Sequence, residues 1–242
     1  MSMLKTIVND IADFIFPPVC PACGEELART EHFVCTACRF RAPLTNLWME
    51  ADNPMVRRLD GLLPVEHASA LMWFIDGSPW QEIIHQFKYA GKWRYARELG
   101  EWYGALLADT TTGGDVDVVV PVPLHWRRRI SRGYNQSELI ADGIASMLGV
   151  KVDSRSLCRH VNNPSQTLGN ADYRWKNADG IFSVRNPQAL YGKHLLLVDD
   201  IFTTGATMVS CGSAIVKSLG ADNVKISIAT IAVTQRSMAI DK

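Results

Sequence analysis

A run of four apolar residues, two aspartates and a loop of small and hydroxylated residues constrains the fold of this 242-residue chain most strongly. The apolar run, residues 195–198, is too short for a helix and suits a parallel strand buried on both faces. Asp199 and Asp200 close this predicted strand, and residues 203–207 lead into an apolar-periodic helix that stops at Gly220. Strand, acidic turn, loop and helix form half of a doubly wound α/β unit, in which ligands bind beyond the carboxyl ends of the strands.

The loop after the aspartates has the composition of a phosphate-binding site. Its consecutive N–H groups can point toward one anion at the positive end of the following helix. Asp199 and Asp200 can accept hydrogen bonds from two ribose hydroxyls, or from waters around Mg²⁺. The whole then describes a ribose 5-phosphate site, and the alternative is a buried strand followed by an ordinary capped helix. The residues expected on the phosphate side are Thr203, Thr204, Gly205, Ala206 and Thr207.

Two C-x-x-C pairs near the N-terminus predict a metal site. Each pair offers two thiolates from one tight turn, as in the knuckles of a zinc ribbon. Because the segment has little apolar content of its own, structural zinc is a better interpretation than a redox disulfide, and His32 is a possible alternative ligand. The four predicted ligands are Cys20, Cys23, Cys35 and Cys38. The two remaining thiols, Cys158 and Cys211, are interpreted as small buried residues.

A second strand, basic loop and helix follow over residues 116–148, where the loop carries four arginines. At the carboxyl edge of a sheet these side chains would meet a pyrophosphate, because guanidinium groups match phosphate oxygens. This interpretation applies best to Arg132. For Arg127, Arg128 and Arg129, a solvated basic face or a patch for nucleic acid or a partner protein stays open as the alternative.

Several of these segments resemble a known family. The run VDDIFTTGAT at 198–207 is similar to the PRPP-binding motif of type I phosphoribosyltransferases. With RGYNQ at 132–136, PSQ at 164–166 and the two C-x-x-C pairs, nearly the whole chain resembles the ComF family, whose enterobacterial members are called GntX. The resemblance implies a type I phosphoribosyltransferase-like α/β fold, a mostly parallel sheet flanked by helices, preceded by a small zinc-ribbon module.

The resemblance also implies roles for individual residues. Asp199 and Asp200 would hold the ribose of PRPP, which binds with Mg²⁺, and favour the positive charge that develops on its ring. Arg132 would neutralise the departing pyrophosphate. Residues 157–180 would form a flap over the substrate, or else a solvated connection. The further candidate substrate-binding residues are Asn135, Gln136, Arg159, Gln166, Arg174 and Asn177.

We therefore expect four parts along the chain: an N-terminal amphipathic helix in 1–18, the zinc ribbon in 19–42, a linker in 43–65 and the phosphoribosyltransferase-like domain in 66–242. Lys and Arg together number 25, as do Asp and Glu, so net charge predicts neither nucleic-acid nor membrane binding. No apolar run approaches the ~20 residues that span a bilayer, and a cytoplasmic protein is expected.

Two kinds of function follow from the resemblance. The first is an enzyme, in which pyrophosphate leaves PRPP and a nucleophile attacks C1 of the ribose; no residue evidently recognises a base as acceptor. The second is a non-catalytic nucleotide-sensing or adaptor protein of DNA uptake. It would bind a helicase-like partner or single-stranded DNA through the zinc ribbon and the basic loop. The intact 199–207 run favours ligand binding.

Overall fold

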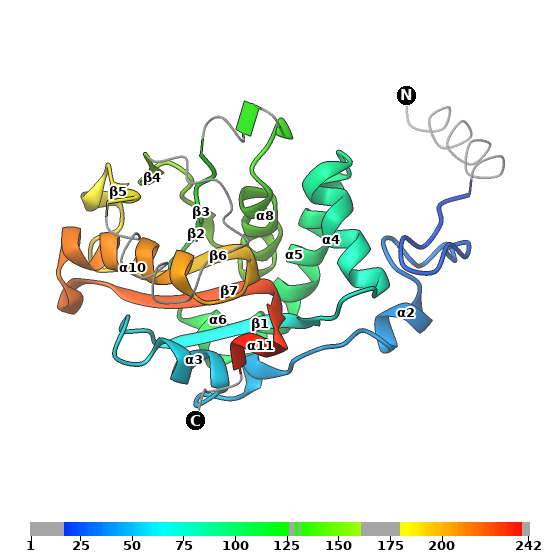
Figure 1. Cartoon of the computed structure of the whole chain (residues 1–242), viewed down its shortest axis with the longest axis horizontal. Coiled ribbons are helices and arrows are strands. Elements are labelled where there is room, and N and C mark those ends of the chain that lie inside the picture. The colour runs from blue at the N-terminus through cyan, green and yellow to red at the C-terminus, as the bar shows by residue number, and fades with distance from the viewer. Residues whose placement is uncertain (1–16, 126–128, 131, 161–179, 239–242) are drawn as a thin grey trace.

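The structure is a computed structural model of the chain (Figure 1) and describes residues 17–125, 129–130, 132–160 and 180–238. Its centre is a five-stranded sheet, whose strands run parallel in the order β1-β7-β6-β2-β3. The strands are β1 (His67–Phe74), β2 (Val118–Pro121), β3 (Lys151–Val152), β6 (His194–Phe202) and β7 (Lys225–Thr234). The predicted fold class, a mostly parallel sheet flanked by helices, is confirmed.

Helices cover both faces of the sheet because its strands are apolar on both sides. Along β6, Leu196 and Val198 pack into one hydrophobic core, and Leu195 and Leu197 pack into the other. The first core is covered by α4 (Pro79–Tyr89), α5 (Trp93–Ala108) and α8 (Gln136–Leu148). The second is covered by α3 (Pro54–Leu59) and α10 (Ala206–Leu219) (Figure 1). None of the helices in the described ranges is long and apolar enough to cross a membrane.

Local sequence signals begin and end these helices. The Ser78 side chain accepts a hydrogen bond from the Gln81 N–H, and Pro79 stands in the first turn of α4. Glycines follow the last residues of α8 and α10, at positions 149 and 220. The apolar residues that recur at helical spacing in α4 are buried: Trp80, Ile83, Ile84 and Phe87. The predicted face of α10 is buried as well: Met208, Val209, Ile215 and Leu219.

Two local predictions are wrong. The aspartates do not close β6, which continues to Phe202 because its last residues still pair with β7. The Cys158 side chain is partly exposed instead of buried, whereas Cys211 is fully buried as predicted. The pairing of β6 with β7 involves residues outside the local pattern. Between α5 and β2 the chain also forms the short helix α6 (Thr111–Gly114).

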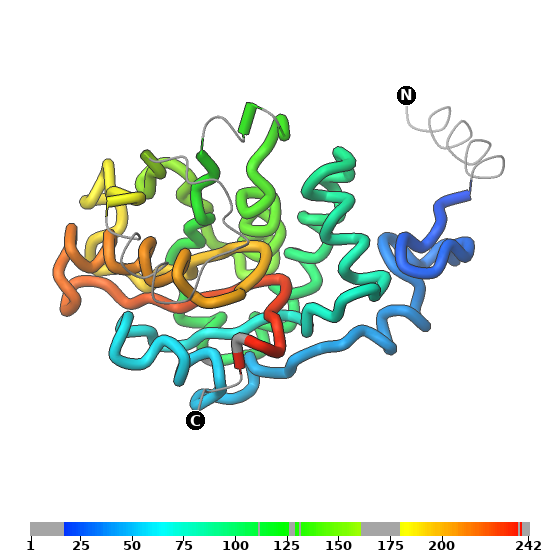
Figure 2. Tube along the Cα trace, viewed as in Figure 1, coloured from blue at the N-terminus to red at the C-terminus, as the bar shows by residue number. Residues whose placement is uncertain are grey.

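Smaller elements complete the chain. They are α2 (Thr36–Phe40), η1 (Leu47–Met49), the antiparallel pair β4 (Leu157–Arg159) and β5 (Phe182–Val184), η2 (Pro187–Ala189), η3 (Ala221–Asn223) and α11 (Gln235–Met238). The segment 43–65 lies beside β1, where the Thr45 N–H bonds to the Leu71 carbonyl at 3.1 Å. It buries Leu47, Trp48, Met55 and Leu59. Figure 2 shows it running from α2 along the edge of the molecule toward α3.

The cysteine-bearing segment packs against α5. The Phe33 ring lies 5.3 Å from the Tyr95 ring, and the Arg39 guanidinium lies 4.8 Å from the centre of the Trp102 ring. Cys20 is fully buried and belongs to the same hydrophobic core as the residues of α5. The metal-binding candidate thus shares a packed surface with the α/β sheet and its helices.

The strand order places a topological switch point at the carboxyl edge of the sheet. From β2 the chain passes through α8 to β3, its outer neighbour, and from β6 it passes through α10 to β7, on the opposite side. The connections therefore diverge between β2 and β6, and their helices lie on opposite faces. Doubly wound sheets bind ligands at this kind of switch point.

Candidate functional site

The aspartates lie where β6 extends beyond its neighbour β2. The pairing of these strands ends at Pro121 and Val198, with one more hydrogen bond of 2.8 Å from the Val122 N–H to the Val198 carbonyl. Past this point β6 stays paired with β7 on its other side. The edge of β6 that carries Asp199 and Asp200 is therefore not paired with β2 and lies at the switch point.

Each aspartate is held through one carboxylate oxygen. Asp199 Oδ1 accepts hydrogen bonds from Ser137 Oγ at 2.8 Å and from the Asp200 N–H at 2.9 Å. Asp200 Oδ2 accepts one from Gln136 Nε2 at 3.0 Å and forms an ion pair with Lys88 Nζ, also at 3.0 Å. No hydrogen bond or ion pair between described residues engages Asp199 Oδ2 or Asp200 Oδ1. Each carboxylate thus keeps one acceptor for a ligand.

The surroundings of Asp199 change the pH at which it ionises. Burial, and then the neighbouring Asp200 carboxylate, raise the pKa of Asp199 to about 7. The hydrogen bonds from the Asp200 N–H and Ser137 and the charge of Lys88 act in the opposite direction without cancelling this rise. Asp199 therefore gains or loses its proton close to neutral pH.

The loop between β6 and α10 combines left-handed backbone with unused N–H groups. Gly205 precedes α10 with φ 82°, and a Cβ there would lie 2.8 Å from Phe202 Cζ, so the position requires glycine. The Ala206 N–H donates to Thr204 Oγ1 at 3.4 Å. Among the described residues the N–H groups of Gly205 and Thr207 have no partner. The Thr203 and Thr207 side chains are exposed beside them.

The 132–136 segment contributes to the site in several ways. Asn135 is buried, donates to the Val122 carbonyl at 3.1 Å and caps α8 by accepting from the Ser137 N–H, so its amide organises the loop. Gln136 reaches Asp200, and its Oε1 is buried without a partner among the described residues. The Arg132 guanidinium lies 4.9 Å from the centre of the Tyr89 ring. The structure brings Gln136 to the aspartates and places Arg132 at the end of α4.

The remaining predicted site residues are only partly described. Arg159 stands in β4, with its guanidinium 5.4 Å from the Phe182 ring centre. Arg129 forms an exposed ion pair of 3.2 Å with Glu138. Five residues named in the sequence analysis lie outside the described residues: Arg127, Arg128, Gln166, Arg174 and Asn177.

Sequence reasoning missed two residues that touch the aspartates, Lys88 and Ser137. Lys88 ends the apolar face of α4, where a lysine is expected to be solvated, and its side chain is instead only 14% exposed. Ser137 follows an N-cap residue and looks like part of the capping sequence. Their proximity to Asp199 and Asp200 depends on helices far away in the chain, and no local pattern indicates it.

The four cysteines form a closed set of ligands. Their sulfur atoms all lie within 4.8 Å of one another, and Cys23 Sγ and Cys35 Sγ are 3.7 Å apart. Tetrahedral Zn–S bonds of about 2.3 Å require sulfur separations of about this size. Burial raises the pKa of Cys20, but N–H groups of Cys35 and nearby residues outweigh it and lower the pKa to about 7. The cluster could hold a metal ion, and zinc fits it.

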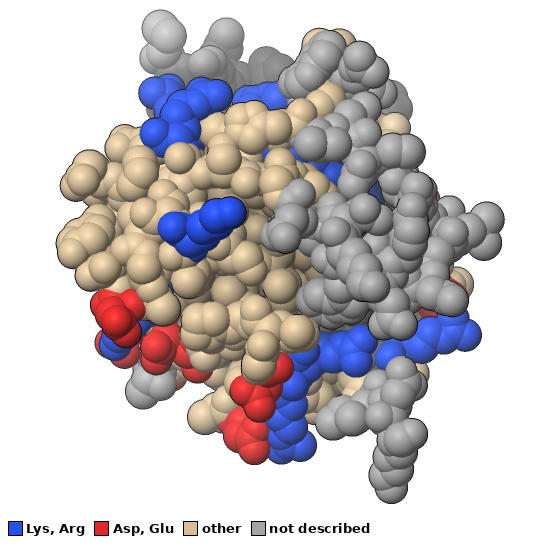
Figure 3. Space-filling view, turned by 60° about the vertical axis from the view of Figure 1, so that its left-hand side comes forward, with Lys and Arg blue, Asp and Glu red and all other residues tan. Residues whose placement is uncertain are grey.

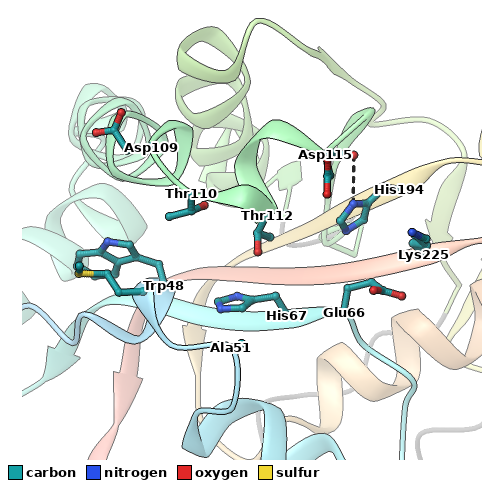
Figure 4. A pocket seen from close by; sticks show the side chains of 11 residues that line it. Trp48, Ala51, Glu66, His67, Asp109, Thr110, Thr112, Asp115, His194 and Lys225 are labelled. Atoms are coloured by element: carbon teal, nitrogen blue, oxygen red, sulfur yellow. Dashed lines mark hydrogen bonds between the residues drawn. The ribbon is translucent and has the colours of Figure 1, made fainter.

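A separate pocket of about 460 Å³ opens at the opposite, amino edge of the sheet (Figure 4). His67 and His194, the first residues of β1 and β6, line it together with acidic side chains and Lys225. His194 Nδ1 donates to the Asp115 carbonyl at 3.1 Å, so Nε2 accepts from Ser227 Oγ at 2.8 Å. Burial lowers the pKa of both histidines. None of the predicted site residues lines this pocket.

Comparisons with known proteins agree with the motifs. No family model matches the chain. The chain is 28% identical over 211 residues to the DNA utilization protein YhgH of Escherichia coli O6:H1, a match that covers 86% of this chain and 88% of that protein. It is 26% identical over 190 residues to the competence protein ComFC of Bacillus subtilis, with 78% and 74% covered.

A solved structure of the glutamine phosphoribosylpyrophosphate (PRPP) amidotransferase from B. subtilis, complexed with ADP and GMP, matches with a TM-score of 0.36 and 19% identity. The match covers 55% of this chain and 26% of that one, so the chain spans about a quarter of its length. With its sequence motifs and its curated relatives, the chain is identified as a homologue of the DNA utilization protein YhgH and of the ComF-type competence proteins.

Proposed function

We propose that the chain binds PRPP at the carboxyl edge of its sheet and has phosphoribosyltransferase-type activity linked to the use or uptake of extracellular DNA. One observation carries the proposal. Asp199 and Asp200 each keep one unengaged carboxylate oxygen beside a loop whose Gly205 and Thr207 N–H groups have no partner among the described residues. Acceptors for two hydroxyls next to donors for a phosphate match the two ends of a ribose 5-phosphate.

Each group of residues would then bind the part of PRPP that has the complementary charge or hydrogen-bonding groups. The two aspartates accept hydrogen bonds from ribose hydroxyls and favour positive charge on the ring as the bond to pyrophosphate breaks. The first turn of α10 and the hydroxyls of Thr203 and Thr207 bind the 5-phosphate. Arg132 stabilises the leaving pyrophosphate, together with the Mg²⁺ that PRPP brings to the site.

Calorimetry with PRPP and Mg²⁺ tests the binding step. Asp200→Asn should weaken PRPP binding by about ten- to a hundredfold, because losing a charge-assisted hydrogen bond removes about 1.5–3 kcal/mol. Asp222→Asn, an exposed change in η3, is the matched control and should bind like the wild type. Absence of PRPP binding by the wild-type chain would contradict the proposal. A pyrophosphate-release assay across nucleobases then tests turnover.

A second candidate function is a non-catalytic adaptor of DNA uptake that binds a helicase-like partner or single-stranded DNA. The segment 19–42, which carries the four clustered cysteines and is called the cysteine module below, favours this function. Its Phe40, at the end of α2, is 91% exposed and stands between Arg39 and Arg41. On the face seen in Figure 3, lysines and arginines form separate groups. The two functions differ in their ligand, so titrations with PRPP and with single-stranded DNA distinguish them.

A further inference from the structure

The last turn of α4 lies beside the aspartates of β6, where Lys88 contacts Asp200. The Tyr134 hydroxyl donates a hydrogen bond to the Phe87 carbonyl, and the Tyr89 ring stacks with the Arg132 guanidinium. Lys88 lies between these two anchored residues. The 132–136 segment thus fixes the end of α4 on both sides of Lys88, which limits where its side chain can reach.

Lys88 points its charge at Asp200. The side chains are 14% and 11% exposed, and their charged atoms are 3.0 Å apart. Buried ion pairs add little to stability, since removing both charges from water offsets their attraction. Stability of the fold therefore gives no reason for placing a lysine here, whereas a ligand site that needs an ordered carboxylate does.

Among the described residues, the side-chain contacts of Asp200 are all made through Oδ2. Lys88 Nζ and Gln136 Nε2 both bind Oδ2, and no described residue engages Oδ1. Two donors on the same oxygen restrict rotation of the carboxylate about its axis. The free oxygen then has a defined position before any ligand arrives.

We infer that Lys88 is a positioning residue of the proposed PRPP site, which holds Asp200 through Oδ2 and so keeps Oδ1 ready to accept a hydrogen bond from a ribose hydroxyl. The inference rests on the proposed function and assigns a role to α4, which none of the sequence motifs includes. The positive charge of Lys88 also offsets part of the negative charge of the adjacent Asp199 and Asp200 carboxylates.

The charged surroundings of this pair are limited among the described residues. The β6 strand contributes Asp199 and Asp200, α4 contributes Lys88, and α8 contributes only the uncharged donors Gln136 and Ser137. In α10, burial and then the Asp199 carboxylate hold the pKa of the Cys211 thiol well above its usual value. The charge of Arg159 in β4 lowers the pKa of that thiol, against these two effects. Lys88 lowers the pKa of Asp199, against the effects of burial and of Asp200.

The first test measures PRPP affinity by calorimetry in the presence of Mg²⁺ between pH 6 and pH 9. We expect Lys88→Met to weaken binding by about tenfold or more at pH 7, because the Asp200 carboxylate loses the ion pair that holds Oδ2, and charge-assisted contacts are the stronger ones. Lys88→Arg should restore most of the affinity. Lys92→Met, at an exposed position in the next turn of the chain, is the matched control and should bind like the wild type.

The second test follows the carboxyl groups of the ligand-free chain by NMR with ¹³C-labelled aspartate. Lys88→Met should raise the pKa of Asp199 above its wild-type value of about 7, which a packing role of the lysine would not do. Lys88→Gln keeps a hydrogen-bond donor without the charge, and it replaces Lys88→Met in both tests if the latter does not fold.

The outcomes separate the two proposals. If the wild type binds PRPP and Lys88→Met binds it with the same affinity, the proposed role of Lys88 is overturned, whatever the titration shows. If the wild-type chain does not bind PRPP, the proposed function fails, and the titration alone then decides whether Lys88 controls the carboxylates. An unchanged Asp199 pKa would in that case overturn the inference.

Discussion

At the scale of single residues, Asp199 makes the ligand-free chain less stable as pH rises. An unfolded aspartate has a pKa of about 3.9, whereas the pKa of folded Asp199 is about 7. Between these values the folded state keeps a proton that the unfolded state has lost, so the free energy of unfolding falls as pH rises through this window. Asp199→Asn should therefore be more stable than the wild type above pH 7, by on the order of 1–2 kcal/mol, or about 2–8 °C in Tm.

Thermal denaturation of both ligand-free chains at pH 4, 6 and 8 measures this difference. Near pH 4 the two chains should denature at similar temperatures, because folded Asp199 is then protonated and the unfolded aspartate is still about half protonated, so little of the difference has developed. Asp222→Asn, at an exposed position, controls for loss of an ordinary surface carboxylate. Parallel stability curves for the wild type and Asp199→Asn across this range would show that burial does not perturb Asp199.

At the scale of elements, α5 and α8 cross with their backbones in contact at three glycines. A Cβ on Gly143 would lie 2.3 Å from the Arg97 carbonyl oxygen, and one on Gly100 would lie 2.3 Å from the Ile140 carbonyl oxygen. Gly104 faces Ile144 in the same way. Gly143→Ala should destabilise the chain by about 1–3 kcal/mol through overpacking, although alanine favours an isolated helix by about 1 kcal/mol.

Chemical denaturation of Gly143→Ala tests this packing. The control is Gly114→Ala, since a Cβ at that position meets nothing within 4 Å, and it should leave stability nearly unchanged. A more stable Gly143→Ala would mean that the helices can separate without loss, and that helix propensity dominates at this crossing.

The cysteine module offers a second prediction at this scale. We expect one zinc ion per chain, and Cys20→Ser should lose it and lower Tm, because Cys20 is also buried in the core that includes α5. PRPP binding should persist, since the carboxyl edge of the sheet has its own contacts. Elemental analysis, thermal denaturation and calorimetry measure the three effects, with Cys158→Ser as the control thiol. A wild-type chain purified without chelator that contains no zinc would contradict this prediction.

At the scale of the whole molecule, the number and placement of charges distinguish the two candidate functions, the PRPP-binding enzyme and the nucleic-acid binder. Lys and Arg number 25, equal to Asp and Glu, so any DNA affinity must come from a local patch and should fall steeply with salt. Arg132→Ala should abolish the binding of PRPP that the titration measures. Joint replacement of Arg127, Arg128 and Arg129 by Ala should change this binding little. Titrations of both variants with PRPP and single-stranded DNA at two salt concentrations measure this. Tight, salt-tolerant DNA binding that is lost in the triple variant and kept in Arg132→Ala would favour the adaptor function.

The sequence by itself determined the features that depend on neighbours along the chain. The apolar faces of α4 and α10, their terminal residues and the spacing of the cysteines are local patterns, and the structure reproduces them. The strand–loop–helix order at Asp199 and again at Arg132 indicated a parallel sheet with both loops at one edge, because parallel strands end at the same edge.

Only the tertiary structure decided what depends on residues far apart in the chain. Lys88 reaches Asp200 because α4 and β6 pack against the same core, and β6 extends past the aspartates because β7 continues to pair with it. The glycines of α5 and α8 look like weak helix formers until the crossing shows that a side chain would not fit. Periodicity and capping act over a few residues, whereas these contacts exist only after the chain has packed.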